Sequence, residues 1–156
     1  MQILLYIFFY FFLFYANANS YIMEDTAAVE KIATISLPDD SEFSTVSIIG
    51  HWSDNLGNFG ISKCYGYLES KKKITLVLDV LCEKETLRGS IFTRGGRKES
   101  LQEAGVGYLK IINAEGDFEI LTGSSCKYGV FYYKNAIQYT TKCDVDDATF
   151  KKLKGD

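Results

Sequence analysis

The sequence predicts an all-β protein, a closed eight-stranded antiparallel β-barrel with a short N-terminal lead-in and a C-terminal helix. Three observations carry this prediction. The 13 glycines fall between short apolar runs, there is a single proline, and aromatic residues make up 15% of the 156-residue chain. Glycine-punctuated apolar runs are typical of strands and turns. Many short antiparallel strands must stack as a sandwich or close on themselves, and closure removes exposed edges.

Eight segments alternate between apolar and polar residues or are bounded by turn residues. They are residues 44–52, 60–69, 73–83, 87–94, 106–113, 117–122, 125–133 and 136–143. The clearest is 73–83, where five even-numbered residues from Ile74 to Cys82 fall on one face of a strand. Connections between the segments are short except for residues 95–105, which we expect to be a loop containing one helical turn.

The first 18 residues have the pattern of a secretory signal peptide. Ile3 to Tyr15 is an uncharged apolar run, and Ala16-Asn17-Ala18 after it is a small-x-small cleavage site. Only the terminal amine supplies positive charge, so an uncleaved anchor is the alternative. Cleavage would leave 156 − 18 = 138 residues in the periplasm or outside the cell. No later segment is long enough to span a bilayer, so no stable membrane span is expected after cleavage.

The mature chain divides into a lead-in at 19–42 and a barrel domain with a C-terminal helix at 43–156. In the lead-in, Ala27, Val29 and Ile32 have the spacing of a short amphipathic helix, which Pro38 would end. The tail from Asp144 starts with acidic residues and ends with lysines, which is the charge order that complements a helix dipole.

The four cysteines predict two disulfides, because an oxidising compartment favours pairing over free thiols. If Lys134 and Asn135 form a two-residue hairpin loop, Cys126 lies directly opposite Cys143, within bridging distance. Cys64 and Cys82 then pair by elimination. A hairpin centred near Lys71 would put Cys64 opposite Leu78, so this second pairing needs a bulge or bend. Buried free thiols are the alternative.

Composition excludes several classes of function. The net charge of −3 argues against a nucleic-acid partner bound through bulk charge. The chain has one histidine and no C-x-x-C pair, and the acids at Asp144, Asp146 and Asp147 are better explained by helix capping than by calcium binding. No nucleophile elbow, phosphate-binding loop or zinc-protease motif is present. We therefore expect no metal, no cofactor and no catalytic residue.

Residues 105–123, GVGYLKIINAEGDFEILTG, have glycines at 107, 116 and 123 with Ile111 and Phe118 between them. This pattern resembles the strand–turn–strand repeat of allene oxide cyclase-like and dirigent-like barrels. The resemblance implies a turn at Gly116 and a core position for Ile111 and Phe118. It carries over no catalytic residue.

Gly50-His51-Trp52, followed by the polar run from Ser53 to Asn58, resembles the opening of lipocalins and avidins, the calycin group. In the avidin pattern, polar residues two and six positions after the tryptophan bind the ligand. The resemblance therefore implies ligand-binding roles for Asp54 and Asn58, beside Trp52.

The 11 tyrosines provide the strongest indication of binding, because buried hydroxyls need partners and so many cannot all be deep core. We expect a non-catalytic barrel that binds a small, partly apolar ligand among Trp52, Tyr128, Tyr132 and Tyr139. One alternative is an envelope or secreted module with a filled barrel whose outer face binds a protein partner. The other is an isomerase or cyclase of the allene oxide cyclase-like type, which would hold an apolar substrate in shape.

Overall fold

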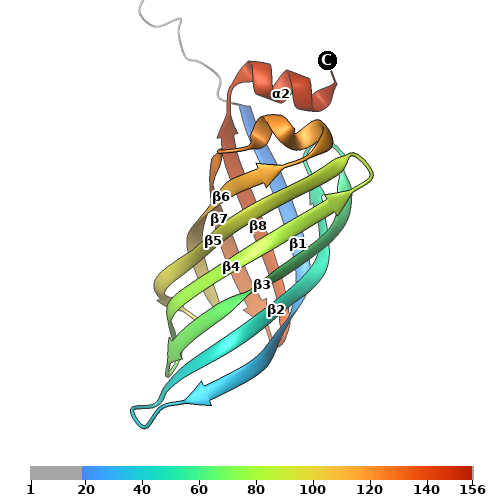
Figure 1. Cartoon of the computed structure of the whole chain (residues 1–156). Coiled ribbons are helices and arrows are strands. Elements are labelled where there is room, and N and C mark those ends of the chain that lie inside the picture. Colours follow the sequence, from blue (N-terminus) through green and yellow to red (C-terminus); the bar gives the residue numbers. More distant parts are fainter. Residues whose placement is uncertain (1–18, 156) are drawn as a thin grey trace, which may run out of the picture.

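A computed structural model describes residues 19–155 as a closed barrel of eight antiparallel strands in simple meander order, with β1 pairing to β8 (Figure 1). The strands are β1 (Asn19–Ser36), β2 (Ser41–Asp54), β3 (Phe59–Lys71), β4 (Ile74–Thr86), β5 (Gly89–Leu101), β6 (Ala104–Ala114), β7 (Ser125–Tyr133) and β8 (Ala136–Val145). A 3₁₀ helix, η1 (Gly116–Leu121), joins β6 to β7, and helix α2 (Asp147–Lys154) follows β8. The predicted fold class is confirmed. The signal-peptide prediction lies outside the described residues.

The segment expected to be a lead-in is the first strand of the barrel. Residues Tyr21, Met23, Asp25 and Ala27 are buried, while Glu24, Thr26 and Ala28, in the opposite phase, are exposed. This is a period of two, so the helix predicted around Ala27 is wrong. The helical spacing was an accident of a strand whose second half turns its apolar residues outward, with Ile32 60% and Ile35 63% exposed.

Two further local predictions are corrected. The segment 117–122 forms no strand, since residues 117–121 lie in η1 and Thr122 is its C-cap. Phe118 and Leu121, three residues apart, both turn into the end of the barrel. Gly116 starts this turn with a φ of 66°, as the glycine pattern indicated. The barrel still has eight strands, because β1, which was not predicted as a strand, takes the place of this segment in the count.

Residues 95–105 are strand as well, apart from the two-residue turn at Gln102 and Glu103 between β5 and β6. The glycines there serve close packing. A Cβ on Gly96 would lie 1.8 Å from the Leu78 carbonyl oxygen, and one on Gly95 would lie 2.4 Å from the Leu109 Cβ. Glycine at these positions lets β5 approach its neighbours closely, so it did not mark a loop.

Both predicted disulfides are confirmed. Cys126 lies directly opposite Cys143 across the β7–β8 hairpin and is bridged to it, as the two-residue loop at Lys134 and Asn135 predicted. Cys64 is opposite Cys82 and bridged to it. The predicted register of this second hairpin was wrong by several residues, because the turn lies at Lys72 and Lys73 and the pairing shifts at a bulge beside Glu69. Both bridges connect neighbouring strands.

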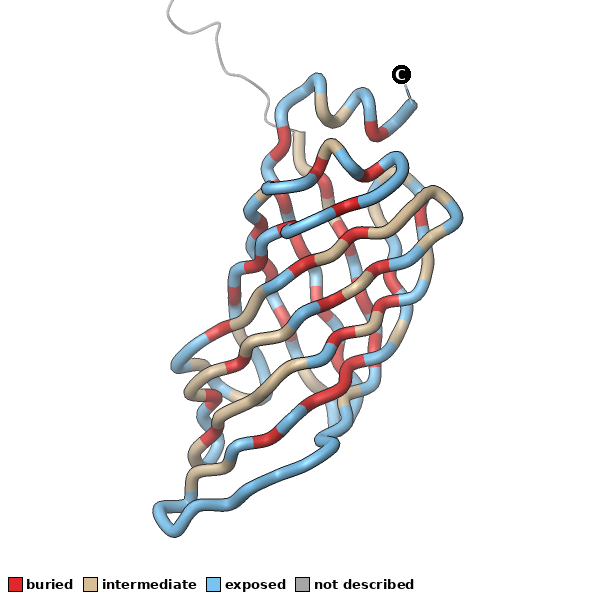
Figure 2. The backbone as a smooth tube through the Cα atoms, in the orientation of Figure 1, coloured by how far each residue is buried: buried red, intermediate tan, exposed pale blue. Residues whose placement is uncertain are grey.

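One end of the barrel is closed. Buried and exposed residues alternate along much of the barrel wall, most regularly in β7 and β8 (Figure 2). The buried rows end at Trp52, whose ring meets that of Phe118 edge-on at 6.2 Å. Helix α2 packs over this end through Leu153, and Asp146 caps the helix by accepting from the Thr149 amide at 2.7 Å. The predicted C-terminal helix is confirmed. Within residues 19–155, no helix has the length and apolar character needed to cross a membrane.

Candidate functional site in the barrel interior

The other end of the barrel is an open mouth. Here the hairpins β1–β2, β3–β4, β5–β6 and β7–β8 turn (Figure 1). A chamber of about 440 Å³ is lined by residues from these hairpins. Apolar and charged side chains share its wall. The lining residues are Val29, Lys31, Val46, Ile48, Leu68, Thr75, Leu78, Arg97, Gln102, Glu103, Tyr132, Lys134 and Asn135. This chamber, which we call the mouth chamber, gives the interior its access to solvent.

A smaller inner cavity of about 40 Å³ lies deeper in the barrel, and its wall is almost wholly apolar. The lining residues are Ile48, Cys64, Leu78, Val80, Cys82, Lys84, Thr93, Gly95, Leu109, Tyr128, Val130, Tyr132, Ile137 and Tyr139. Ile48, Leu78 and Tyr132 line both the inner cavity and the mouth chamber. The two spaces are therefore adjacent, and these three side chains lie between them at a position that we call the neck.

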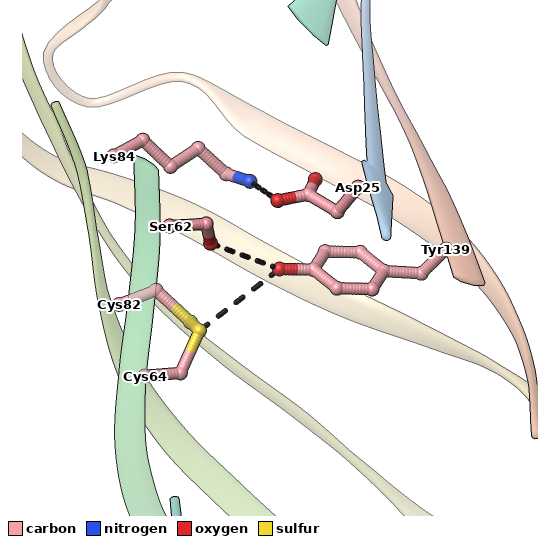
Figure 3. The surroundings of a disulfide bond; sticks show 6 residues. All are labelled: Asp25, Ser62, Cys64, Cys82, Lys84 and Tyr139. Atoms are coloured by element: carbon pink, nitrogen blue, oxygen red, sulfur yellow. Dashed lines mark hydrogen bonds and ion pairs between the residues drawn. A yellow bond between two sulfur atoms is a disulfide. The ribbon is translucent and has the colours of Figure 1, made fainter. Parts of the chain in front are cut away.

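Three of the predicted site residues, Tyr128, Tyr132 and Tyr139, line the inner cavity together. The rings of Tyr128 and Tyr139 meet edge-on with centroids 6.4 Å apart. The Tyr139 hydroxyl lies 3.4 Å from the Ser62 Oγ and 3.9 Å from the Cys64 Sγ (Figure 3). Burial raises the pKa of Tyr128 to about 12 and holds that of Tyr139 well above 10. Both hydroxyls are therefore neutral at physiological pH and able to donate.

A buried ion pair lies beside the inner cavity. Lys84 on β4 donates from its Nζ to Asp25 Oδ1 on β1, and both side chains are almost fully enclosed (Figure 3). The Lys84 Nζ also lies 5.1 Å from the centre of the Tyr139 ring and 5.5 Å from that of Trp52. Burial lowers the pKa of Lys84 although Asp25 acts in the opposite direction. The pair forms a polar layer between the cavity and the closed end.

The sequence reasoning missed Asp25, Lys84 and Arg97, although each lies in phase with a buried row. Lys84 continues the even-numbered face of residues 78–82, and Arg97 continues the buried series Ile91 and Thr93. Extending the period of two through charged positions would have found both. Asp25 could not be found that way while its segment was expected to be helical.

The other predicted site residues, Trp52, Asp54 and Asn58, lie at the closed end and do not line the inner cavity. Asp54 Oδ1 accepts from the amides of Leu56 and Asn58 at 2.9 and 2.8 Å. Its Oδ2 accepts from the Asn58 Nδ2 at 2.7 Å and from the Tyr21 hydroxyl at 2.8 Å. These hydrogen bonds organise the β2–β3 loop, so the carboxylate is already saturated by the protein.

Arg88 connects this loop to the rest of the closed end. Its Nη1 donates to Asn58 Oδ1 at 3.0 Å, its Nε to Asp117 Oδ2 at 2.7 Å and its Nη2 to the Leu153 carbonyl at 3.2 Å. One side chain therefore joins the β2–β3 loop, η1 and α2. The six predicted ligand residues are therefore divided: three line the inner cavity, and three lie at the closed end, which we call the cap.

His51 points outward, opposite in phase to the buried Trp52, as expected from strand alternation. In the described range 19–155, no three His, Cys, Asp or Glu side chains gather in a way that would hold a metal ion.

Comparison with known proteins yields no relative. No family model, no curated protein and no solved structure matches the chain. The barrel is compatible with a small-barrel fold, and the likeness to calycins and allene oxide cyclases rests only on the residues quoted for it.

Proposed function

We propose that this disulfide-bonded barrel is an exported, non-catalytic protein that binds a small, partly apolar ligand in its interior. The ligand enters through the mouth chamber and reaches the tyrosines of the inner cavity. The observation that carries the proposal is the mouth chamber of about 440 Å³, which lies directly next to the tyrosine-lined inner cavity and shares Ile48, Leu78 and Tyr132 with it. A fully packed barrel would have left no such chamber, since protein interiors are filled nearly to crystal density.

The volumes indicate how a ligand would lie. Small-molecule sites have volumes of roughly 300–1,000 Å³, and the mouth chamber of about 440 Å³ falls within this range. The inner cavity of about 40 Å³ has room for only a few atoms. The body of the ligand therefore occupies the mouth chamber, and a narrow apolar end passes the neck toward Tyr128 and Tyr139.

Export is the second part of the proposal. The two disulfides support an oxidising compartment, because cytosolic thiols are kept reduced. The signal-like pattern of residues 1–18 agrees with this. Mass determination of the protein recovered from the periplasm or medium tests it, with an N-terminus near Asn19 and four oxidised cysteines expected. Retention in the cytosol would contradict it.

Ligand binding is tested with a neutral apolar fluorophore, N-phenyl-1-naphthylamine, whose emission rises in an apolar site. Val130→Phe adds a ring to a side chain that lines the inner cavity, and we expect it to weaken the fluorescence response severalfold. Val106→Phe is the matched control, because this valine is 67% exposed on the outside of the neighbouring strand β6. Equal responses from wild type and both variants would place the dye outside the barrel.

A second candidate function is a protein-interaction module. Four large apolar side chains point outward from β6 and β7: Val106, Tyr108, Phe131 and Tyr133, exposed by 67%, 67%, 56% and 72%. Val106 is opposite Gly129, which has no side chain to separate it from Phe131. Such a patch favours a protein partner. A double variant, Tyr108→Ser with Phe131→Ser, would abolish partner capture and leave dye binding unchanged. Isomerase or cyclase activity stays a prediction. A buried carboxylate facing the cavity would favour it, but the buried carboxylate of Asp25 is paired with Lys84 and does not line the inner cavity.

A further inference from the structure

Arg97 is more deeply enclosed than the other two arginines of the barrel, Arg88 and Arg94. It lies on β5, lines the mouth chamber and is only 5% exposed. Resting on the ligand-binding function proposed above, we propose that Arg97 binds a carboxylate of the ligand. The ligand is then an amphipathic acid, with an apolar chain or ring system directed to the inner cavity and its carboxylate held in the mouth chamber.

The hydrogen bonds of Arg97 leave part of its guanidinium unused. Nη1 donates to the carbonyls of Leu101 and Ala104 at 2.8 and 3.1 Å, and Nη2 donates to the carbonyl of Gln102 at 3.3 Å. A guanidinium has five N–H groups. Three are matched by these carbonyls of the β5–β6 turn, so the Nε–H and one Nη2–H remain, and Nε has no partner.

These remaining groups are of the kind that bind a carboxylate. Arg94, three residues earlier on the same strand, donates from its Nε and Nη2 to the two carboxylate oxygens of Asp79 at 3.2 and 2.8 Å. This is the bidentate geometry that arginine and carboxylates favour. In Arg97 the Nε is buried without a hydrogen-bond partner, and no carboxylate of residues 19–155 lies on these two atoms, so a small shift of the side chain toward the chamber would present them to a ligand.

The charge of Arg97 is met by the face of the Tyr132 ring, 5.4 Å from its Cζ, but by no carboxylate. Arg88 and Arg94 form ion pairs with Asp117 and Asp79, whereas the described part of the chain contains no ion pair for Arg97. An enclosed charge is costly unless a partner of opposite sign is close. The two arginines that are more exposed thus have carboxylates, and the most enclosed one does not. A ligand carboxylate would supply the missing charge.

The other charged groups of the mouth chamber agree with an anionic ligand. Two lysines line the chamber: Lys31, which is bonded to Glu42 at 2.9 Å, and Lys134, which lies over the Tyr133 ring. Among the lining residues that the structure describes, Glu103 is the only acid. Glu103 is exposed to solvent, so water screens its repulsion of an anion. A role for Arg97 in holding the turn accounts for its three carbonyl bonds but not for its free Nε–H.

The test compares two ligands that differ only in the head group, decanoate and 1-decanol. Their affinities are measured at one ionic strength by displacement of N-phenyl-1-naphthylamine. For wild type we expect decanoate to bind about tenfold more tightly than decanol. Arg97→Gln should remove this preference while decanol affinity changes little. Arg94→Gln is the matched control, because this arginine lies on the outside of the same strand, and it should keep the preference.

The outcomes separate the two proposals. If wild type binds both ligands equally, the role of Arg97 is overturned and the binding function stands. If wild type binds neither ligand nor the dye, the binding function fails. Should Arg97→Gln unfold because it loses the turn carbonyls, Arg97→Lys retains the charge without the fork. A reduced but measurable preference in that variant supports the proposal, and an unchanged preference contradicts it.

Discussion

Lys84 and Asp25 form an ion pair across the barrel interior and so connect β4 to β1, two strands that are not neighbours in the sheet. Each disulfide, by contrast, joins strands already held by backbone hydrogen bonds. The ion pair therefore connects two opposite parts of the barrel wall that no backbone hydrogen bonds connect. Asp25 Oδ2 meets no donor within hydrogen-bond geometry, and Lys84 is the cation that the carboxylate contacts.

We expect Lys84→Met to destabilise the barrel strongly, because it leaves Asp25 buried and unpaired. Removal of one partner of a buried pair costs about 3–5 kcal/mol. The double variant Lys84→Met with Asp25→Leu should recover most of this loss, since neither charge then remains. Urea unfolding of the single and double variants gives the free energies. Additive losses in the double variant would show that the two side chains act independently.

Replacing either disulfide by alanines should lower stability by about 3 kcal/mol, because the loops closed by Cys64–Cys82 and Cys126–Cys143 are of similar length, 18 and 17 residues in separation. The chain-entropy effect acts mainly on the unfolded state. Denaturant unfolding gives the free energy of unfolding of each double-alanine variant, of oxidised wild type and of wild type in reducing buffer. Reduced wild type should lose roughly the sum, and an unchanged midpoint in either variant would contradict the estimate.

Alkaline pH should destabilise the barrel through its buried tyrosines. The pKa of Tyr128 is raised to about 12 in the folded state, above its unfolded value of about 10. Its contribution is complete below pH 10 and falls as pH rises toward 12. The loss is about 3 kcal/mol for this side chain. Urea unfolding at pH 8 to 12 should show a shallower decline for Tyr128→Phe than for wild type. Tyr133→Phe, at a position 72% exposed, should follow wild type.

Asp54 has a structural role at the closed end in the observed geometry and a ligand-binding role in the avidin-like interpretation, and a variant separates the two. Asp54→Ala removes the acceptor of the Leu56 and Asn58 amides and of the buried Tyr21 hydroxyl. We expect a loss of about 2–3 kcal/mol in stability and faster amide exchange in the β2–β3 loop. Dye and decanoate binding at the opposite end should be unchanged at temperatures where the variant is folded. Loss of binding would instead support a ligand role for Asp54. Asp144→Ala, an exposed acid near the same end, is the control.

The fold was predictable where local patterns and turn lengths determine register. Cys126 could be placed opposite Cys143 because a two-residue loop leaves only one pairing. Cys64 could be assigned only by elimination, since a bulge beside Glu69 displaces the pairing in a way that the alternation of residues does not reveal. Gly95 and Gly96 were misread as loop residues for a related reason. The need for close approach between strands arises from the closed barrel and has no local signature.

The site was predictable only in part. Tyr128, Tyr132 and Tyr139 share a face of one hairpin, so a period of two places them together. Lys84 acquires its role from Asp25 across the barrel, and Arg97 from the carbonyls of the β5–β6 turn that it contacts on the inside. Neither was expected, because charged residues normally lie on the outer face. Whether Trp52 lines a cavity or closes an end depends on how far η1 and α2 cover the barrel. That contact is made by Phe118 and Leu153, remote in sequence from Trp52.

The pairing of β1 with β8 puts Asn19 opposite Val145, with Asn19 Nδ2 donating to Asp147 Oδ1 at 2.7 Å. Both extremities of residues 19–155 therefore lie beside the closed end, at the far side from the chamber. A fusion tag or surface tether attached there would leave the entrance clear. The same adjacency allows a circular permutant in which a short linker joins α2 to β1 and new termini open the hairpin at Leu37–Ser41.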